Sequence, residues 1–387
     1  MISTFQGYRR NKNVIGIRNH LLLIPTVICA NQVCNRIQQL VPSSIAIPHQ
    51  HGCSQIGADK QRTFDVLAGT GKNPNVGGVI IVSLGCEVVD PIALADEIRS
   101  TGKLVEVFDI QSIGGSIKAI EHGVGLATEM QAKLDMMQKE AIPFSELKIG
   151  VKCGGSDATS GIASNPALGV AADRLIEFGG TVVIGETTEI IGAEHVLAER
   201  CRSEETSKRL YHIVNRFERE VERMGADMRG GNPSPGNIAG GLSTIEEKSL
   251  GCISKCGTAP IEGIVEYAEQ VPSGGLYFMD SPGNDIECVS GMAAGGVHLV
   301  CFTTGRGTPT GAAVIPVIKI TGNAAMYKQM SDNMDIDVSA LMGGGTSLED
   351  SGHTIWSEIQ AVAGGKLTKA EILGHTEFSI NRIGPSL

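Results

Sequence analysis

The chain has 387 residues, a formal net charge of -10 and 50 glycines, while only 4% of its residues are aromatic. This length suffices for two domains of ordinary size, each with its own core. The negative charge argues against nucleic acid or an anionic membrane as the main partner, because both select a basic face. Abundant glycine with few aromatic residues favours tight strand-to-helix loops, as in α/β proteins.

Targeting signals and membrane spans are not evident in the sequence. No window reaches the roughly 18 apolar residues of a membrane span, and the N-terminus lacks the long apolar core of a signal peptide. The ten cysteines mostly follow predicted strands beside glycine, which is unlike the loop-rich scaffold of a small disulfide-bonded domain. We therefore predict a reduced, cytoplasmic protein that contacts neither a membrane nor nucleic acid.

The first part of the chain alternates predicted strands with predicted helices. Gly7 to Asn19 predicts a short hairpin that turns near Asn11 to Asn13. The strands that follow are expected at 21–28, 45–47, 78–83 and 104–108, and the helices at 31–40, 59–67, 91–100 and 115–139. Such alternation predicts a largely parallel sheet flanked by helices, and we assign it to a first lobe, residues 1–143.

The second lobe, residues 144–387, begins with the stretch that organises the chain, Leu147 to His195. An apolar strand at 147–151 leads into a Gly/Ser loop, and Pro166 begins a helix that Gly179 and Gly180 end. A second apolar strand at 181–184 then ends on a glutamate. This is one βαβ unit, and ligands bind at the carboxyl ends of strands in such sheets, so we expect the site there.

The remainder of the second lobe continues the α/β plan. Charged residues at helical spacing over 197–224 predict a solvated helix, and the segment 230–241, GGNPSPGNIAGG, predicts a functional loop or lid. Further strands are expected at 276–279, 297–302 and 313–320. The tail from residue 330 onward is predicted to be helical and to pack across the second lobe.

The loop that follows the strand at 297–302 reads TTGRGTPTG. Its backbone amides suit an anion, and Arg306 suits a bidentate pair with a carboxylate, although a purely structural turn is the alternative. It is not a Walker loop, because no Gly-Lys-Ser/Thr follows. Arg9 and Arg18 in the opening segment either bind an acidic substrate at a lobe junction or are surface arginines.

Carboxylates gather after the strand at 181–184. Glu186, Glu189 and Glu194 are spaced so that at most two converge, and His195 follows them. Such a group suits a hard divalent cation or proton transfer, and the alternative is an acidic helix start stabilised by the helix dipole.

Cysteines at strand ends allow three interpretations. Cys53, Cys86, Cys153 and Cys301 are suited to a [4Fe–4S] cluster, one or two of them to a mononuclear iron together with His49 or His51, and each of them to a crowded structural corner. Cys252 and Cys256 lack a second pair at zinc-finger spacing, so a structural zinc site is not expected.

Long segments of the chain resemble one known family. GYRRNKNVIGIRN, HGCSQ, SLGCE, KCGGSDATSGIASNPALG, GETTEIIGAEH, PSPGNIAGGLSTIEEKSLG, MDSPG and CFTTGRGTPTG closely resemble the altronate/galactarate dehydratase family, which includes the large subunit of sulfolactate sulfo-lyase. The resemblance covers nearly the whole chain in the right order. It implies a lyase that acts on a small hydroxylated carboxylic acid and commonly depends on iron(II), giving a 2-keto-3-deoxy acid when water leaves.

The resemblance also implies partners. Single-chain dehydratases of this family carry a small β-rich domain ahead of the GY-R-N segment, whereas this sequence begins almost at that segment. We therefore expect a separate small β-rich subunit, as in the sulfo-lyase, and an oligomer. The alternatives are a sulfolactate sulfo-lyase that releases sulfite, and, from another class, an iron–sulfur or sugar-acid binding protein without turnover.

A β-elimination from such an acid needs a base, an anion site and charge stabilisation, and these needs define the candidate residues. The base and other catalytic groups are sought among His51, Lys152, Asp157 and Glu186. The substrate-binding candidates are Arg9, Arg18, Ser156, Thr303, Thr304, Gly305, Arg306 and Gly307. The candidate ligands of a divalent metal, expected to be Fe(II), are His49, Cys53, Cys86, Glu189, Glu194 and His195.

Overall fold

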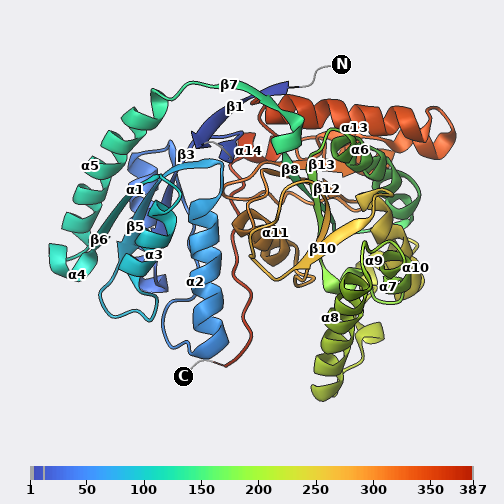
Figure 1. Cartoon of the computed structure of the whole chain (residues 1–387), viewed down its shortest axis with the longest axis horizontal. Helices are drawn as coiled ribbons and strands as arrows, with labels where there is room; N and C mark the ends of the chain where they lie inside the picture. The colour runs from blue at the N-terminus through green and yellow to red at the C-terminus, as the bar shows by residue number, and fades with distance from the viewer. Residues whose placement is uncertain (1–3, 12–13, 386–387) are drawn as a thin grey trace.

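The computed structural model describes residues 4–11 and 14–385, and it folds into two α/β lobes joined by an antiparallel ribbon (Figure 1). The ribbon has the order β2-β1-β7. Its strands are β1 (Thr4–Asn11), β2 (Val14–Gly16) and β7 (Glu140–Pro143). The predicted hairpin is therefore present, while residues 12–13 of its turn lie outside the described residues.

The first lobe holds a four-stranded parallel sheet with the order β4-β3-β5-β6. Its strands are β3 (His20–Pro25), β4 (Ser44–Ala46), β5 (Val76–Ser83) and β6 (Leu104–Asp109). Its main helices are α1 (Asn31–Leu40), α2 (Gly57–Lys72), α3 (Pro91–Arg99) and α5 (Ser116–Asp135). Side chains alternate along β3, so Leu21 and Leu23 pack with α1 and α5, and Leu22 and Ile24 pack with α2 and α3.

The second lobe holds a seven-stranded parallel sheet with the order β10-β11-β9-β8-β12-β13-β14. Its strands are β8 (Lys148–Cys153), β9 (Thr181–Ile184), β10 (Ile261–Val265), β11 (Gly275–Met279), β12 (Leu299–Thr303), β13 (Val317–Thr321) and β14 (Ile336–Asp337). The predicted class, two mostly parallel sheets flanked by helices, is confirmed. Both sheets are continuous apolar runs at their centres, as expected for strands buried on two faces.

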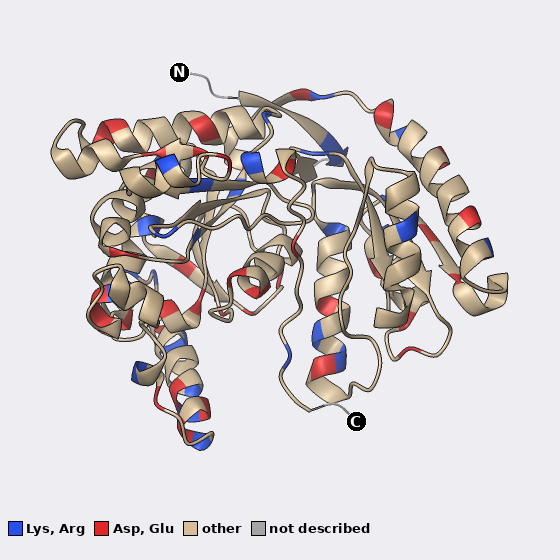
Figure 2. Cartoon of the chain, turned by 180° about the vertical axis from the view of Figure 1, so that it is seen from behind, with Lys and Arg blue, Asp and Glu red and all other residues tan. Residues whose placement is uncertain are grey.

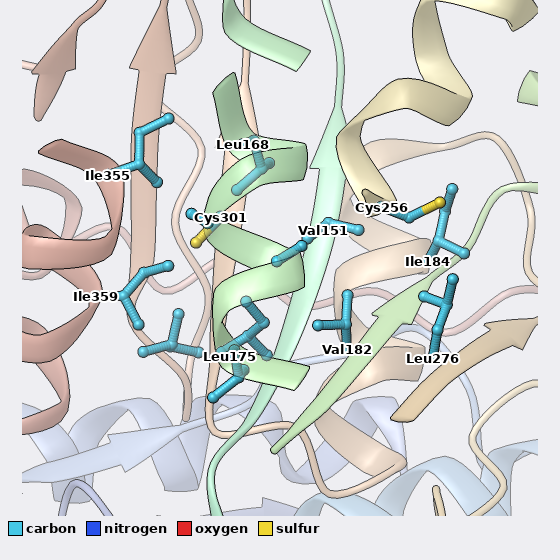
Figure 3. Close-up of a cluster of buried hydrophobic side chains, with 14 of the residues drawn as sticks. Val151, Leu168, Leu175, Val182, Ile184, Cys256, Leu276, Cys301, Ile355 and Ile359 are labelled. Atoms are coloured by element: carbon cyan, nitrogen blue, oxygen red, sulfur yellow. The ribbon is translucent and has the colours of Figure 1, made fainter. Parts of the chain in front are cut away.

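Helices cover both faces of the second sheet. One face is covered by α6 (Asn165–Glu177) and α13 (Leu348–Ala363), and Figure 3 shows Leu168 and Leu175 of α6 and Ile359 of α13 gathered over the strands. The other face is covered by α11 (Asp285–Ala294), which also packs on α2 of the first lobe. The remaining short helices are α4 (Ile110–Ile113), α7 (Glu194–Ala198), α9 (Pro235–Ala239), α10 (Ile245–Ile253), α12 (Ala324–Gln329) and α14 (Lys369–Ile372).

The charged helix predicted at 197–224 is α8 (Glu204–Arg223), which extends away from the body of the second lobe and carries residues of both signs (Figure 2). In the part of the chain that the structure describes, we find no helix long and apolar enough to cross a membrane. In Figure 1 α4, which follows β6 in the first lobe, and α7, which comes after β9 in the second, lie toward the same lower side.

The prediction of a helical tail over the second lobe is wrong in part. Among the described residues of this tail, the helices are the 3-10 helix η7 (Ser339–Gly343), α13 and α14, and β14 joins the sheet. Residues 375–385 have no regular structure and run back to the first lobe, where Ile383 and Gly384 donate their amides to the Asp59 carboxylate at 2.7 Å each. The tail therefore joins the two lobes.

Candidate active site

A cavity of about 460 Å³ opens at the carboxyl ends of β8 and β9 in the second lobe. Its walls come from the loop after β8, the turn η4 (Thr187–Glu189) after β9, the end of α8, the 227–237 segment and one residue each from α10 and α11. The titratable residues that line it are Cys153, Glu186, Glu189, Asp227, Lys248 and Asp285. Two parallel strands thus deliver polar groups into one hollow, as the sequence predicts.

Lys152, the penultimate residue of β8, is fully buried behind this cavity. Its ammonium lies 2.6 Å from Glu186 Oε1, 2.5 Å from Asp285 Oδ1 and 2.5 Å from the Cys153 carbonyl oxygen. Burial opposes the charge, but Glu186 and Asp285 together raise the Lys152 pKa well above its ordinary value. Lys152 therefore stays protonated and positions the two carboxylates, so it does not suit the role of a base.

Glu186 has a strained backbone conformation, and only one of its two carboxylate oxygens has a hydrogen-bond partner among the described residues. Its φ of 69° lies in the left-handed region, which residues other than glycine rarely occupy, and Ser281 Oγ holds its amide at 2.8 Å. Lys152 binds Oε1, whereas Oε2 is buried with no partner among the described residues. Burial raises the Glu186 pKa well above its ordinary value, against the attraction of Lys152, which makes this carboxylate a stronger base.

A pair of thiols lies beside the cavity, which Cys153 lines and Cys252 does not. Cys153 Sγ and Cys252 Sγ are 3.4 Å apart, and the buried Lys255 ammonium lies 2.6 Å from Cys252 Sγ and 3.5 Å from Cys153 Sγ. The hydrogen bond between the two thiols and the positive charge of Lys255 lower the Cys153 pKa to about 5, while the same bond and burial raise the Cys252 pKa. These opposite shifts favour a shared state in which Cys153 loses its proton before Cys252 does.

Glu189 lies next to the thiol pair. Its Oε1 accepts from Lys248 Nζ at 2.9 Å, and Lys248 also donates to Asn232 Oδ1 at 2.7 Å. Its Oε2 is buried without a partner among the described residues. Two carboxylate oxygens left unpaired in the wall of one cavity point to a ligand that would satisfy them, because an unsatisfied buried acceptor is costly.

Three of these residues fit a metal ion. Single ligand atoms of Cys153, Glu189 and Cys252 all lie within 4.8 Å of one another. The lowered pKa of Cys153 favours its thiolate form, and the unpaired Glu189 Oε2 supplies an oxygen donor. Two sulfurs and one carboxylate suit a divalent ion of intermediate softness better than magnesium or calcium, which prefer oxygen.

The loop after β12 adjoins this site without lining it. Gly155 accepts hydrogen bonds from the amides of Gly305 at 3.2 Å and Arg306 at 2.9 Å, so the β12 loop is fastened to the β8 loop. Residues 303–307 are all described, and none of them lines the cavity. Arg306 is exposed beside α9.

The hydroxyls and the aspartate of these loops are engaged in structural contacts. Thr303 Oγ1 donates to Asn165 Oδ1 at 2.5 Å, and Thr304 Oγ1 accepts from the Gly307 amide at 3.0 Å. Asp157 Oδ1 accepts from Thr159 and Ser160, and its Oδ2 accepts from Asn323, so both oxygens are occupied. Ser156, by contrast, is buried and lines the cavity.

The structure does not bring the first-lobe candidates into this cavity. His49 Nε2 donates to the Pro25 carbonyl at 2.7 Å, and its Nδ1 accepts from the His51 amide. His51 Nε2 donates to the Ile380 carbonyl at 3.0 Å, and its Nδ1 faces the Gln55 amide group. Both nitrogens of each ring are used, which leaves neither free for a metal or a substrate proton. Cys53 and Cys86 are exposed at the edge of the first lobe.

The remaining candidates are also elsewhere. Arg9 pairs with Glu140 and Glu146 on the ribbon. The buried Arg18 binds Glu371 and three backbone carbonyls between the lobes. Glu194 accepts from the Gly192 amide, and His195 is exposed on α7.

Sequence reasoning missed Cys252, Lys248 and Lys255 on α10 and the turn after it, of which Lys248 lines the cavity and the other two are buried beside Cys153. Their spacings of four and three residues on a helix place them on one side, and that signal was available. Asp285 was missed as well, although it lies just after the MDSPG segment that resembles the family.

Two family comparisons cover most of the chain. Residues 7–135 match the second domain of D-galactarate dehydratase/altronate hydrolase, and residues 144–386 match the C-terminal domain of D-galactarate/altronate dehydratase. Among curated proteins, the chain is 38% identical to the (2R)-sulfolactate sulfo-lyase subunit beta of Chromohalobacter salexigens over 98% of this chain and 97% of that protein. It is 36% identical to the altronate dehydratase of Bacillus subtilis (99% and 78%) and 33% identical to the galactarate dehydratase of Escherichia coli (94% and 73%).

The relatives and the cavity together define the class of this protein, which is a lyase of the carbon–oxygen hydro-lyase type or the related carbon–sulfur type. More narrowly, the chain belongs to the D-galactarate/altronate dehydratase family.

Proposed function

We propose that the protein is a metal-assisted dehydratase that removes water from a sugar acid such as altronate or galactarate and gives a 2-keto-3-deoxy acid. The observation that carries this proposal is the pair of unpaired, buried carboxylate oxygens, Glu186 Oε2 and Glu189 Oε2, in the wall of one cavity. Glu186 Oε2 is suited to proton abstraction, and Glu189 Oε2 is suited to binding a cation.

Glu186 is the proposed base. The C2 proton of a hydroxy acid is weakly acidic, and Glu186 Oε2 would take it while Lys152 holds Oε1 in place. The C3 hydroxyl then leaves with a proton as water, and the resulting enol becomes the keto acid. Lys248 supplies positive charge at the cavity wall for the carboxylate on which negative charge develops.

Cys153, Glu189 and Cys252 are the residues that would hold the divalent metal, with iron(II) as the proposed ion. When bound, such an ion polarises a carboxylate or hydroxyl oxygen of the substrate. The cavity needs this positive charge, because its titratable lining contains four carboxyl groups and one lysine.

Replacing Glu186 by Gln should lower kcat by about 10²- to 10⁴-fold, because the amide keeps the shape but cannot accept the proton. Glu194→Gln is the matched control, since Glu194 lies on the next helix and outside the cavity lining. The assay measures 2-keto acid formed from altronate and galactarate with iron(II). If the kcat of the Glu186→Gln variant is within tenfold of the parent value, Glu186 is not the base.

Removal of the metal ligands gives an independent test. Cys252→Ser should lower both the iron content and the activity. Cys301→Ser, at a buried position of β12, should leave both unchanged. Metal analysis after gel filtration and the keto-acid assay measure the two effects. If Cys252→Ser retains full iron content, the metal lies elsewhere.

The second candidate is a sulfolactate sulfo-lyase that works with a separate small β-rich subunit. It is supported by the similarity over 97% of a protein named as a subunit beta. We further propose that the protein is an oligomer. A screen of sugar acids and sulfolactate, with and without a candidate small subunit, separates the two functions by whether 2-keto acid or sulfite is released.

A further inference from the structure

The chain's exposed cysteines lie together at a place that the proposed function does not use. Cys29, Cys53 and Cys86 are exposed, whereas the other seven cysteines are buried or half-buried. The three follow β3, β4 and β5, which are neighbours in the first sheet. Adjacent strands are about 4.8 Å apart, so three loops that follow them span roughly 10 Å. An exposed free thiol is usually avoided, which makes this gathering informative.

Backbone hydrogen bonds tie the three loops to one another. The Ile28 amide donates to the His51 carbonyl at 3.0 Å, and the Val88 amide donates to the Gly52 carbonyl at 2.9 Å. Each of the three cysteines lies within two residues of one of these bonds. The loops therefore form a single assembly at the carboxyl edge of the first sheet.

Glu87 fixes two of the loops to each other. Its carboxylate accepts from the amides of Leu84, Gly85 and Cys86 at 3.1, 2.7 and 2.9 Å, and from Thr26 Oγ1 at 2.6 Å. The backbone on both sides of this carboxylate is thus held without any use of the thiols.

The loop that carries Cys53 is strained where it meets the β3 loop. Gly52 has a φ of 94°, and a Cβ on it would lie 2.1 Å from the Thr26 carbonyl oxygen, so only glycine allows this approach. Ser54 on the other side has a φ of 54°, which is rare for a residue other than glycine. A strained residue beside one exposed cysteine is typical of a functional loop.

Sulfur is the donor that this edge offers. Both ring nitrogens of the nearby His49 and His51 are already bonded to protein groups. Cysteine thiolates are the usual ligands of iron–sulfur clusters, and the hydrogen-bonded loops that follow three neighbouring strands bring three exposed cysteines to this edge.

We propose that Cys29, Cys53 and Cys86 bind a [4Fe–4S] cluster at the carboxyl edge of the first sheet. Three thiolates hold three of the iron atoms, and the fourth iron takes a ligand from outside the trio. Cys153 and Cys301, which the sequence had grouped with Cys53 and Cys86, take no part, because they belong to the second lobe and are buried there.

The test is anaerobic reconstitution of the full chain with ferrous iron and sulfide. We expect a brown protein with broad visible absorption that contains four iron atoms and four acid-labile sulfides per chain, in addition to the single iron of the proposed dehydratase site. Cys29→Ser, Cys53→Ser and Cys86→Ser should each lose most of the colour and sulfide, whereas the half-buried Cys201→Ser control should keep them. Iron bound without sulfide, or colour retained in all three variants, would overturn the proposal.

Alkylation of the unmutated protein gives a readout that needs no variant. Iodoacetamide should label the three cysteines in the apo protein and spare them after reconstitution, as read by peptide mass spectrometry. Equal labelling before and after would contradict a cluster. Glu186→Gln and Cys252→Ser should both retain the colour, so a failed cluster and a failed dehydratase site give different results.

Discussion

His298 is a residue that joins the ribbon to the second sheet through both of its ring nitrogens. Nδ1 accepts from the Lys148 amide at 2.9 Å, and Nε2 donates to the Ile15 carbonyl at 2.9 Å. Burial lowers its pKa to about 4, so the ring is neutral in the folded protein. Between about pH 6.5 and pH 4 the unfolded chain binds a proton that the folded chain refuses.

His298 should therefore make the protein less stable as the pH falls through this window, by roughly 1–3 kcal/mol. His298→Gln keeps an acceptor and a donor but does not titrate, so part of the pH dependence should disappear. Urea unfolding at pH 7 and pH 5 measures the effect. Equal losses of stability in the parent and the variant would show that other groups, such as His49, cause it.

At the same scale, the sequence named Lys152, Glu186 and Glu189 as candidates near the ends of apolar strands, and the structure places Glu186 and Glu189 in the cavity lining and Lys152 against Glu186. Their roles stay predictions. It did not predict Cys252 or Lys248, because α10 lies far along the chain from β8 and only the tertiary fold brings them together. The histidines at 49 and 51 looked like ligands, yet local carbonyls occupy their donors, and no sequence pattern reveals such bonds.

At the scale of elements, the loop after β12 is held against the loop after β8 by a close approach. A Cβ on Gly305 would lie 2.0 Å from the Asp157 carboxylate carbon, and Asp157 itself is bonded to Thr159, Ser160 and Asn323. The packing of the loop after β12 against the loop after β8 therefore requires glycine at position 305.

Gly305→Ala should destabilise the protein by about 1–3 kcal/mol, as overpacking does, and should reduce activity because the β8 loop lines the cavity. Gly125→Ala is the control, since a Cβ there meets no atom within 4 Å and alanine favours the helix by up to about 1 kcal/mol. Thermal unfolding of both variants tests this. A neutral Gly305→Ala would mean that Asp157 moves aside without cost.

Elements were predicted best where apolar runs are long. The central strands β5, β8 and β12 were predicted from such runs. The strands β7 and β14 are short, and they form because they pair with neighbouring strands. The segment 375–385 was mistaken for helix because its fixed shape comes from contacts with the first lobe rather than from its own periodicity.

At the scale of the whole molecule, Arg18 connects the start of the chain with its last helix. Nε lies 2.7 Å from Glu371 Oε1, Nη2 lies 2.9 Å from Oε2, and the other donors reach the Ile17, Val362 and Lys366 carbonyls. The Arg18 and Glu371 side chains are 8% and 17% exposed, so the pair is largely shielded from water.

Arg18→Met should cost about 3–5 kcal/mol, because it leaves the Glu371 carboxylate buried without its cation. Arg99→Met removes an exposed pair with Asp96 and should cost no more than about 1 kcal/mol. Chemical denaturation followed by circular dichroism measures both. Similar stabilities for the two variants would show that the lobes hold together without this bridge.

The return of residues 375–385 to the first lobe has a consequence during protein synthesis. Asp59 at the start of α2 and His51 before it receive partners that are translated more than 300 residues later. The first lobe can collapse early on the ribosome, but these contacts must wait until translation is nearly finished. A ribosome stalled before residue 375 should therefore present a nascent first lobe that proteases cut more readily near α2 than in the released protein.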